Sequence, residues 1–185
     1  MLCGAFDALG RSRPGAMMEL NLCERTWRAA AGANPASAGP GLLAPVATLP
    51  EADADYPRTR KIRDEWRILG LSVREHPMAL ARPRVAHLVD ADSRDLPAAA
   101  GRRVRIAGLL EARRTTDTAR GERMGFLTFD DEFGLFEVTV FPDARAAAGP
   151  FHTYGPYVIT GRVESQYDEI TITADRVRPA RGGPP

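Results

Sequence analysis

The feature that most constrains the fold of this chain is an alternation of apolar and polar residues between Arg102 and Phe141. In the first segment of this run, one parity holds Val104, Ile106, Gly108 and Leu110, and the other holds Arg103, Arg105, Leu109 and Glu111. A period of two residues is typical of a β-strand with one buried face. The same alternation returns at Leu127 and Phe129, and again at Phe136, Val138 and Val140. The sequence therefore predicts three consecutive strands.

Two further strands are predicted after a gap, at Tyr157–Gln166 and Ile170–Val177. Five short strands with one longer connection between the third and the fourth are the order of a small closed barrel of the OB type. We therefore predict a mainly β fold, a five-stranded OB-fold barrel with a helical, partly disordered N-terminal extension. Barrels of this type bind single-stranded nucleic acids on one face, flanked by their loops.

The charge of the chain is informative only locally. The net charge is +1, which by itself indicates no nucleic-acid partner. Between Arg102 and Arg123, however, seven arginines stand against Glu111, Asp117 and Glu122, a local balance of +4. Acidic residues in the next strands offset these arginines in the net charge of the whole chain.

Strand parity predicts a binding face. If Leu127 and Phe129 point into the barrel, Phe126 and Thr128 point out, as do Arg103, Arg105, Leu109 and Arg113 on the first strand and Glu137 and Thr139 on the third. An outward phenylalanine beside arginines provides base stacking and phosphate neutralisation together. Arg113–Arg123 is the loop between the first two strands and is predicted to close around a bound strand. The residues predicted to contact nucleic acid are Arg103, Arg105, Arg113, Arg114, Arg120, Arg123, Phe126 and Thr128.

Two alternatives to this interpretation remain open. Phe126 could pack under the first loop or against the N-terminal segment, and the arginine-rich loop could be an ordinary solvated loop. Glu137 lies in the same row as the predicted binding residues and would either repel phosphate or contact a base edge.

The chain divides into five predicted segments. Residues 1–30 are helical, 31–57 form a flexible linker rich in Ala, Pro and Gly, and 58–100 form a short helical connector. The barrel spans 101–178, and 179–185 form a disordered tail. Within the connector, one helix over 58–69 should end near Gly70, and a second is predicted over 78–88. His76, which precedes Pro77, is predicted to pack or to cap.

No catalytic or metal-binding set is predicted. Glu51, Asp53 and Asp55 lie between prolines in an Ala-rich stretch, which favours a solvated linker over a metal site. The acidic run Asp130–Glu132 falls at a predicted turn, where Asp side chains commonly accept hydrogen bonds from the local backbone. No nucleophile motif and no phosphate-loop motif is present. We therefore expect no cofactor.

Three ordered stretches of the sequence resemble one known family, the bacterial DNA polymerase III alpha subunits, both replicative and error-prone. The run from Val104 through Phe141, with Gly-Arg-Val beginning at Gly161, is similar to the family's OB domain. Asp64–Met78, DEWRILGLSVREHPM, is similar to the segment that precedes that barrel. Leu2–Gly10, LCGAFDALG, followed by Arg13, resembles the last element of the family's helix-hairpin-helix DNA-binding module, so 1–30 would be a remnant of it.

The resemblance implies a function in DNA replication or lesion bypass, with single-stranded DNA as the partner and with other replication or polymerase subunits as further partners. The family's catalytic domain would precede this region, so the chain on its own is expected not to be an enzyme. An RNA-binding OB module of the translation type is one alternative, and a protein-interaction barrel or non-functional remnant is another. Cys3 and Cys23 form no metal-binding motif, and neither a signal peptide nor a membrane span is recognisable, so a cytoplasmic location is expected.

Overall fold

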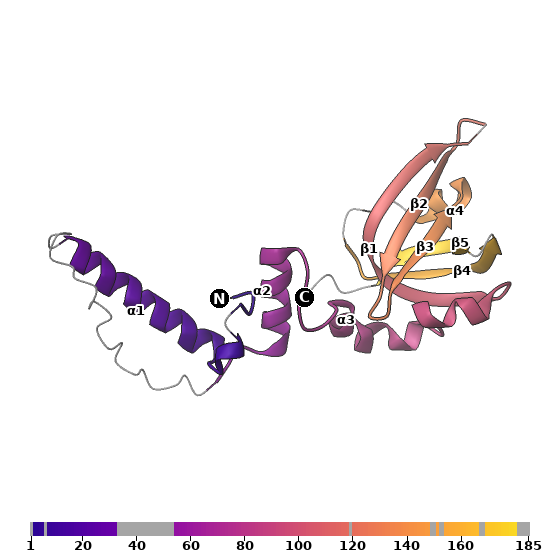
Figure 1. The fold of residues 1–185 in the computed structure, drawn as a ribbon. Coiled ribbons are helices and arrows are strands. Elements are labelled where there is room, and N and C mark those ends of the chain that lie inside the picture. Colours follow the sequence, from indigo (N-terminus) through magenta and orange to yellow (C-terminus); the bar gives the residue numbers. More distant parts are fainter. Residues whose placement is uncertain are drawn as a thin grey trace. The chain divides into compact units, whose positions relative to one another are not determined.

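The computed structural model describes residues 2–5, 7–32, 54–118, 120–148, 151, 154–166 and 169–180 (Figure 1). The chain forms two compact units, Met1–Arg74 and Glu75–Pro185, and each is considered by itself. The predicted connector 58–100 contributes to both units. Of the predicted linker 31–57 and the predicted tail 179–185, residues 33–53 and 181–185 fall outside the described residues. Residues 31–32 are helical and residue 179 ends the last strand, so both predictions were one or two residues too long.

The first unit is helical. A short 3-10 turn, η1 (Asp7–Leu9), is followed by α1 (Arg13–Gly32) and later by α2 (Arg58–Leu69). The predicted end of α2 is confirmed, because Gly70 adopts the left-handed conformation at φ 71° and its N–H donates to the Trp66 carbonyl at 3.0 Å. A residue with a side chain adopts this conformation only with strain, so glycine suits the position.

Arg13 holds the pieces of the first unit together. Its guanidinium is almost fully buried and donates to Asp7, to Glu65 of α2 at 2.5 Å and to the Leu2 carbonyl at 2.7 Å. The hydrogen bonds to Asp7 and Glu65 outweigh burial and raise the pKa of Arg13 well above its ordinary value. A buried cation with this many partners is a structural group, and removal of Arg13 would leave the buried Glu65 carboxylate without its counter-charge.

The second unit begins with short helices that lead into the barrel. The predicted second helix is present as α3 (Met78–Val85), continued by a 3-10 turn. The 3-10 turns of this region are η2 (Ala86–Leu88), η3 (Ser93–Asp95) and η4 (Pro97–Ala99). His76 accepts a hydrogen bond at Nδ1 from the Met78 N–H at 3.2 Å, which is the capping role predicted for it.

Five strands close into a barrel in the order β1-β2-β3-β5-β4. Only β3 and β5 are parallel among these neighbours, and a helix lies in the longer connection between β3 and β4. The elements are β1 (Arg103–Asp117), β2 (Arg123–Asp130), β3 (Leu135–Val140), α4 (Pro142–Ala148), β4 (Tyr157–Gln166) and β5 (Glu169–Pro179). The predicted five-stranded OB-fold barrel is thus confirmed.

The barrel core consists of the inward parity of every strand. Phe129 is fully buried and packs at centroid distances of 5.8 Å from Phe136 and 5.9 Å from Tyr157. Gly108 of β1 makes room for this aromatic group, because a Cβ there would lie 2.8 Å from the Phe136 ring. The parity prediction for β2 is confirmed, since Phe126 is 38% exposed while Phe129 is not exposed at all.

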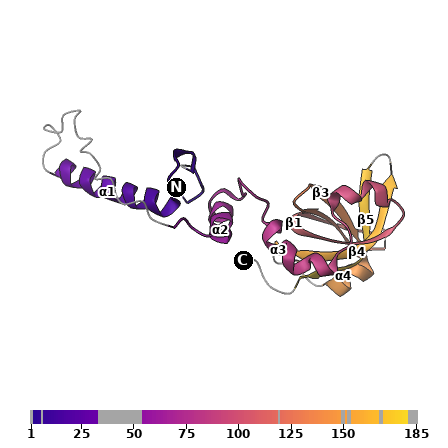
Figure 2. The same ribbon diagram turned by 90° about the horizontal axis from the view of Figure 1, so that it is seen from below.

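Part of the outer face of β1 is covered. Leu109 was predicted to point outward, and it does leave the barrel interior, but it is buried in a second apolar cluster with Met78 and Val85 of α3. Figures 1 and 2 show α3 beside β1 and β4. The first half of β1 therefore offers no open face at Leu109.

A β-bulge divides β1 into two halves. The pairing with β2 shifts between Leu110 and Ala112, so Glu111 is an extra residue. A bulge of one residue reverses the parity beyond it. From Ala112 to Asp117, β1 pairs with β2 alone within the described part of the chain, and this hairpin extends beyond the rest of the barrel (Figure 1).

Candidate nucleic-acid interface

Phe126 occupies the centre of the outer face of β2. The strand register sets it directly across from Arg114 on β1 and from Thr139 on β3. Residues directly opposite in a sheet share one face and lie about 5 Å apart. The ring is therefore flanked by a guanidinium on one side and a hydroxyl on the other, which suits stacking against a base with a phosphate nearby.

Two shallow hollows meet at Phe126. The first holds Thr128, which faces Ala112 on β1 and Glu137 on β3. Arg113, Arg114 and Glu137 line it, but the strand register turns the Arg113 side chain to the other face of the hairpin. On this face the charges of Arg114 and Glu137 therefore balance.

The second hollow extends toward β4 and β5 and is acidic. Its charged side chains are Glu164 at the end of β4 and Glu169 at the start of β5. Met124 and Phe141 give it an apolar floor next to Phe126. Phosphate would be repelled on this side, so a nucleic-acid backbone is favoured only on the β1–β2 side of Phe126.

Arg113 does not lie beside Phe126, contrary to the predicted parity. Because of the bulge, Arg113 is opposite Leu127, an inward residue, and Arg114 takes the place on the outer face. The Arg113 guanidinium donates to the Phe151 carbonyl at 2.7 Å. The sequence pattern does not indicate on which face Arg113 lies, because no large apolar residue follows Leu110 in β1.

Arg103 and Arg105 lie away from this site, which corrects the prediction that they flank Phe126. Nine residues separate Arg105 from Arg114 along β1, or roughly 30 Å of extended strand. Arg103 forms an ion pair with Asp175 at 2.8 Å, and Arg105 forms one with Asp90 at 3.0 Å. Burial opposes ionisation of Asp90, but hydrogen bonds from Arg105 outweigh it and lower the pKa of Asp90.

Arg120 lies in the turn between β1 and β2, and Arg123 begins β2 at the tip of the hairpin. The predicted loop Arg113–Arg123 is wrong in its bounds, because β1 continues to Asp117 and leaves only 118–122 as the turn. Both are exposed, and Arg123 is across from Asp117. The turn is closed by hydrogen bonds between the Thr118 and Glu122 backbones and from the Gly121 N–H to the Thr118 carbonyl, each 2.8 Å long. Thr115 to Asp117 are exposed as well.

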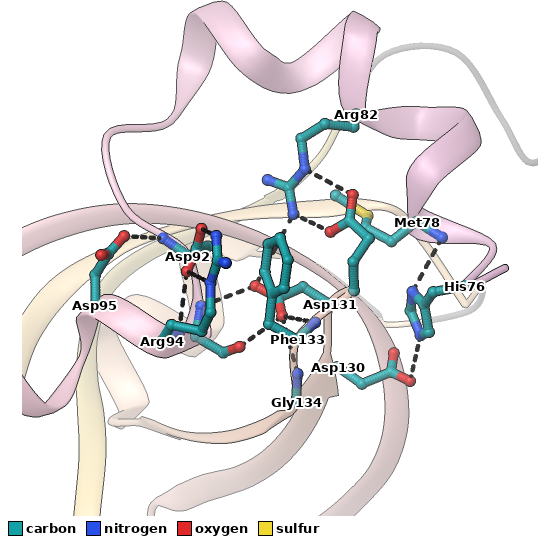
Figure 3. A network of polar contacts seen from close by, with 12 residues as sticks. His76, Met78, Arg82, Asp92, Arg94, Asp95, Asp130, Asp131, Phe133 and Gly134 are labelled. Atoms are coloured by element: carbon teal, nitrogen blue, oxygen red, sulfur yellow. Dashed lines mark hydrogen bonds and ion pairs between the residues drawn. The ribbon is translucent and has the colours of Figure 1, made fainter.

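The acidic turn between β2 and β3 is structural (Figure 3). Asp131 is buried and accepts hydrogen bonds from the backbone N–H groups of Phe133 and Gly134, and from the backbone and hydroxyl of Ser93. The predicted turn chemistry is confirmed. Asp131 also joins the turn to η3, a contact between residues 38 positions apart that spacing alone does not reveal.

The two carboxylates beside Asp131 are paired as well (Figure 3). Arg82 of α3 donates to both oxygens of Glu132, and Nε2 of His76 lies 2.7 Å from Asp130. Burial lowers the pKa of His76, but the hydrogen bond and charge of Asp130 outweigh it and raise the pKa above the usual value. For the neighbouring Glu111, burial and the charge of Asp130 raise the pKa.

The described residues contain neither a group of side chains suited to a metal ion nor a helix suited to a membrane span. No three His, Cys, Asp or Glu side chains in this part of the chain gather to hold an ion, and none of its helices combines the length and apolar character needed to span a bilayer. Of the acidic residues near the linker, Glu51 and Asp53 lie outside the described residues. Asp55 accepts from the Arg13 backbone N–H at 3.1 Å and pairs with Lys61.

Strand parity could have identified two further residues of the site, Met124 and Phe141, which the sequence prediction omitted. Met124 and Phe126 are two positions apart on β2 and share the outer face, and Phe141 follows β3 with the parity of Thr139. The acidic border at Glu164 and Glu169 depends on β4 and β5 closing against β3, and no local pattern indicates it.

Comparison of sequences finds clear relatives. An error-prone DNA polymerase of Anaeromyxobacter dehalogenans is 32% identical over 178 residues, which cover 95% of this chain and 15% of the relative. A DNA polymerase III subunit alpha of Pasteurella multocida is 31% identical over 153 residues, or 78% of this chain and 13% of the relative. The chain thus spans a small part of the length of these proteins. No family model matches it.

Comparison of structures finds weaker similarities. The second OB-fold domain of replication protein A from Methanococcus maripaludis is 12% identical with a TM-score of 0.39, covering 50% of this chain and 97% of that one. The asparaginyl-tRNA synthetase from Pyrococcus horikoshii is 15% identical with a TM-score of 0.36, covering 47% of this chain and 22% of that one.

Proposed function

Because the chain belongs to the C-terminal part of the bacterial DNA polymerase III alpha-subunit family, error-prone members included, we propose that its OB barrel binds single-stranded DNA during replication or lesion bypass. The observation that carries the proposal is the exposed Phe126 between Arg114 and Thr139 on an open sheet face. The bases would stack on the ring, and the backbone would follow the β1–β2 side. The role is binding and guidance of a strand, with no chemistry by this chain alone.

The charges around the site limit the expected affinity. One stacked base contributes about 1–3 kcal/mol. Glu137 balances Arg114 beside Phe126, and Glu164 and Glu169 oppose phosphate on the other side. We therefore expect weak, sequence-tolerant binding, in the micromolar range or weaker.

Fluorescence anisotropy with a labelled oligothymidylate of about 16 nucleotides, the upper end of OB-fold site sizes, tests the proposal. Binding should weaken as salt rises, because phosphate contacts release counterions. Phe126→Ala should weaken it by about 1–3 kcal/mol. Phe133→Ala is the matched control, since Phe133 is an exposed ring in the turn after β2 that stacks on Arg94.

Arginine variants refine the same measurement. Arg114→Ala should lower the salt slope by about 0.7, the value for one phosphate contact on a single strand. Arg105→Ala should change it less, because Asp90 already neutralises Arg105. An absence of binding at low salt, or binding that ignores salt, would refute the proposal. Tighter binding to RNA of the same sequence would favour the RNA-binding alternative.

A further inference from the structure

The β1–β2 hairpin has a second face, opposite Phe126, which we call the inner face of the hairpin. The register assigns Arg113, Thr115 and Asp117 of β1 to it, across from Leu127, Gly125 and Arg123 of β2. Arg113 and Thr115 are about 7 Å apart along the strand. Two guanidiniums and a hydroxyl thus share a surface that extends past the closed part of the barrel.

Helix α4 adds a third guanidinium to this face. Arg145 lies over Gly125, because a Cβ built on that glycine would be 3.1 Å from Nη1 of Arg145. Figure 1 shows α4 beside β2 near the base of the hairpin. The absence of a side chain at Gly125 therefore lets a cation from α4 approach the backbone of β2.

Arg145 is half-buried and has no side-chain hydrogen bond or ion pair within the described residues. Partly buried guanidiniums normally find partners, because loss of water around unpaired N–H groups is costly. Arg113 uses one donor on the Phe151 carbonyl, which fixes its position and leaves four of its five N–H groups free for an anion.

The acids around this surface do not cancel its charge. Asp117 is the acidic side chain on the inner face and lies across from Arg123. Asp143 is on α4, two positions from Arg145, and is exposed. Residues two apart on a helix point to different sides, so Asp143 does not face the guanidinium of Arg145. Arg113 and Arg145 remain as uncompensated charges.

We propose that Arg145 and Arg113 form a phosphate-binding site on the inner face of the hairpin, which takes the backbone of the bound single strand. The strand would stack a base on Phe126 and then pass around the unpaired edge of β1 to this site. The site rests on the proposed function and adds a position on α4 that faces away from the stacking surface. Sugar-phosphate is the recognised chemistry, without regard to the bases.

Two probes of equal length test the site by anisotropy, an oligothymidylate and an abasic sugar-phosphate oligomer, each of about 16 units. Arg145→Gln keeps a polar side chain, shorter than that of arginine, and removes the charge. It should weaken the binding of both probes about three- to tenfold and lower the salt slope by about 0.7. Phe126→Ala should weaken the oligothymidylate only. Arg176→Gln, at an exposed arginine of β5, is the control and should change neither probe.

Arg145→Lys distinguishes binding from packing, because it retains the charge. It should restore most of the lost affinity at an unchanged melting temperature. If Arg145→Gln binds both probes like the unaltered protein, the phosphate site is wrong and the proposed function stands. A lowered melting temperature that Arg145→Lys does not recover would assign Arg145 a structural role and overturn the site. If the unaltered protein binds neither probe, both proposals fail.

Discussion

The two ends of strand β2 are both rich in charge, but they use it differently. At the end of β2, Asp130, Asp131 and Glu132 all have partners on the segment between His76 and Arg94. At its start, Arg114 and Arg145 have no side-chain partner in the described parts of the chain. Charge pairing, and not charge content, therefore separates a structural region from a candidate binding surface.

Long-range contacts cause this difference. The acidic turn lies where α3 and η3 pack, and each of its carboxylates meets a donor that stands 38 to 54 residues earlier in the chain. The basic hairpin extends beyond the barrel, and its guanidiniums at Arg114 and Arg145 meet no carboxylate among the described residues. Removal of charge should therefore affect stability at one end and nucleic-acid binding at the other.

The largest effect on stability is expected for a core residue of β2, between its acidic end and its basic start. Phe129→Ala should lower the free energy of unfolding by about 3–5 kcal/mol, because it leaves a cavity among Phe136 and Tyr157. Phe126→Ala should leave the melting temperature nearly unchanged. Thermal and chemical denaturation of both variants tests this. Equal destabilisation by the two substitutions would mean that Phe126 is a core residue, and the binding face would be lost.

A smaller effect is expected at the acidic turn. Asp131→Ala removes an acceptor shared by Ser93, Phe133 and Gly134, and should lower the free energy of unfolding by about 1–3 kcal/mol. Asp143→Ala on α4 is the matched control and should stay within about 0.5 kcal/mol, as is usual for an exposed site. A neutral Asp131→Ala would show that the paired end is not structural.

The smallest effect concerns pH. The folded protein raises the pKa of His76, so its ion pair with Asp130 is fully stabilising below the unfolded pKa of about 6.5 and is lost as pH rises through the folded pKa. In the charged ring Nδ1 carries a proton and no longer accepts from the Met78 N–H, which offsets part of this gain. The loss should be at most about 1 kcal/mol. Denaturation at a series of pH values should show it, and His76→Gln should remove it. A pH dependence that survives His76→Gln would have to come from Glu111 or another group.

The sequence predicted the strands and the outward Phe126 because those features are local. Apolar residues at every second position mark the parity of β2 and β3, and glycine at position 70 marks the end of α2. No knowledge of the partner strand is needed for either inference. The five-strand order then narrowed the fold to one type of barrel.

Features that depend on strand pairing could not be predicted in this way. After Leu110 the first strand has no large apolar residue, so nothing marks the parity that the bulge at Glu111 reverses. Arg113 was therefore assigned to the wrong face. The partners of Arg103 and Arg105 lie on other segments, as does the apolar cover of Leu109, and only the closed fold brings these together.

The half of β1 that pairs on one side alone has a consequence for self-association. A strand with an unpaired edge offers its backbone N–H and carbonyl groups to any other extended chain, including a second copy of this protein. From Ala112 to Asp117 that edge carries Arg113 and Arg114, so two copies that paired there would bring like charges together. The guanidiniums proposed to attract phosphate would thus also protect the hairpin from aggregation.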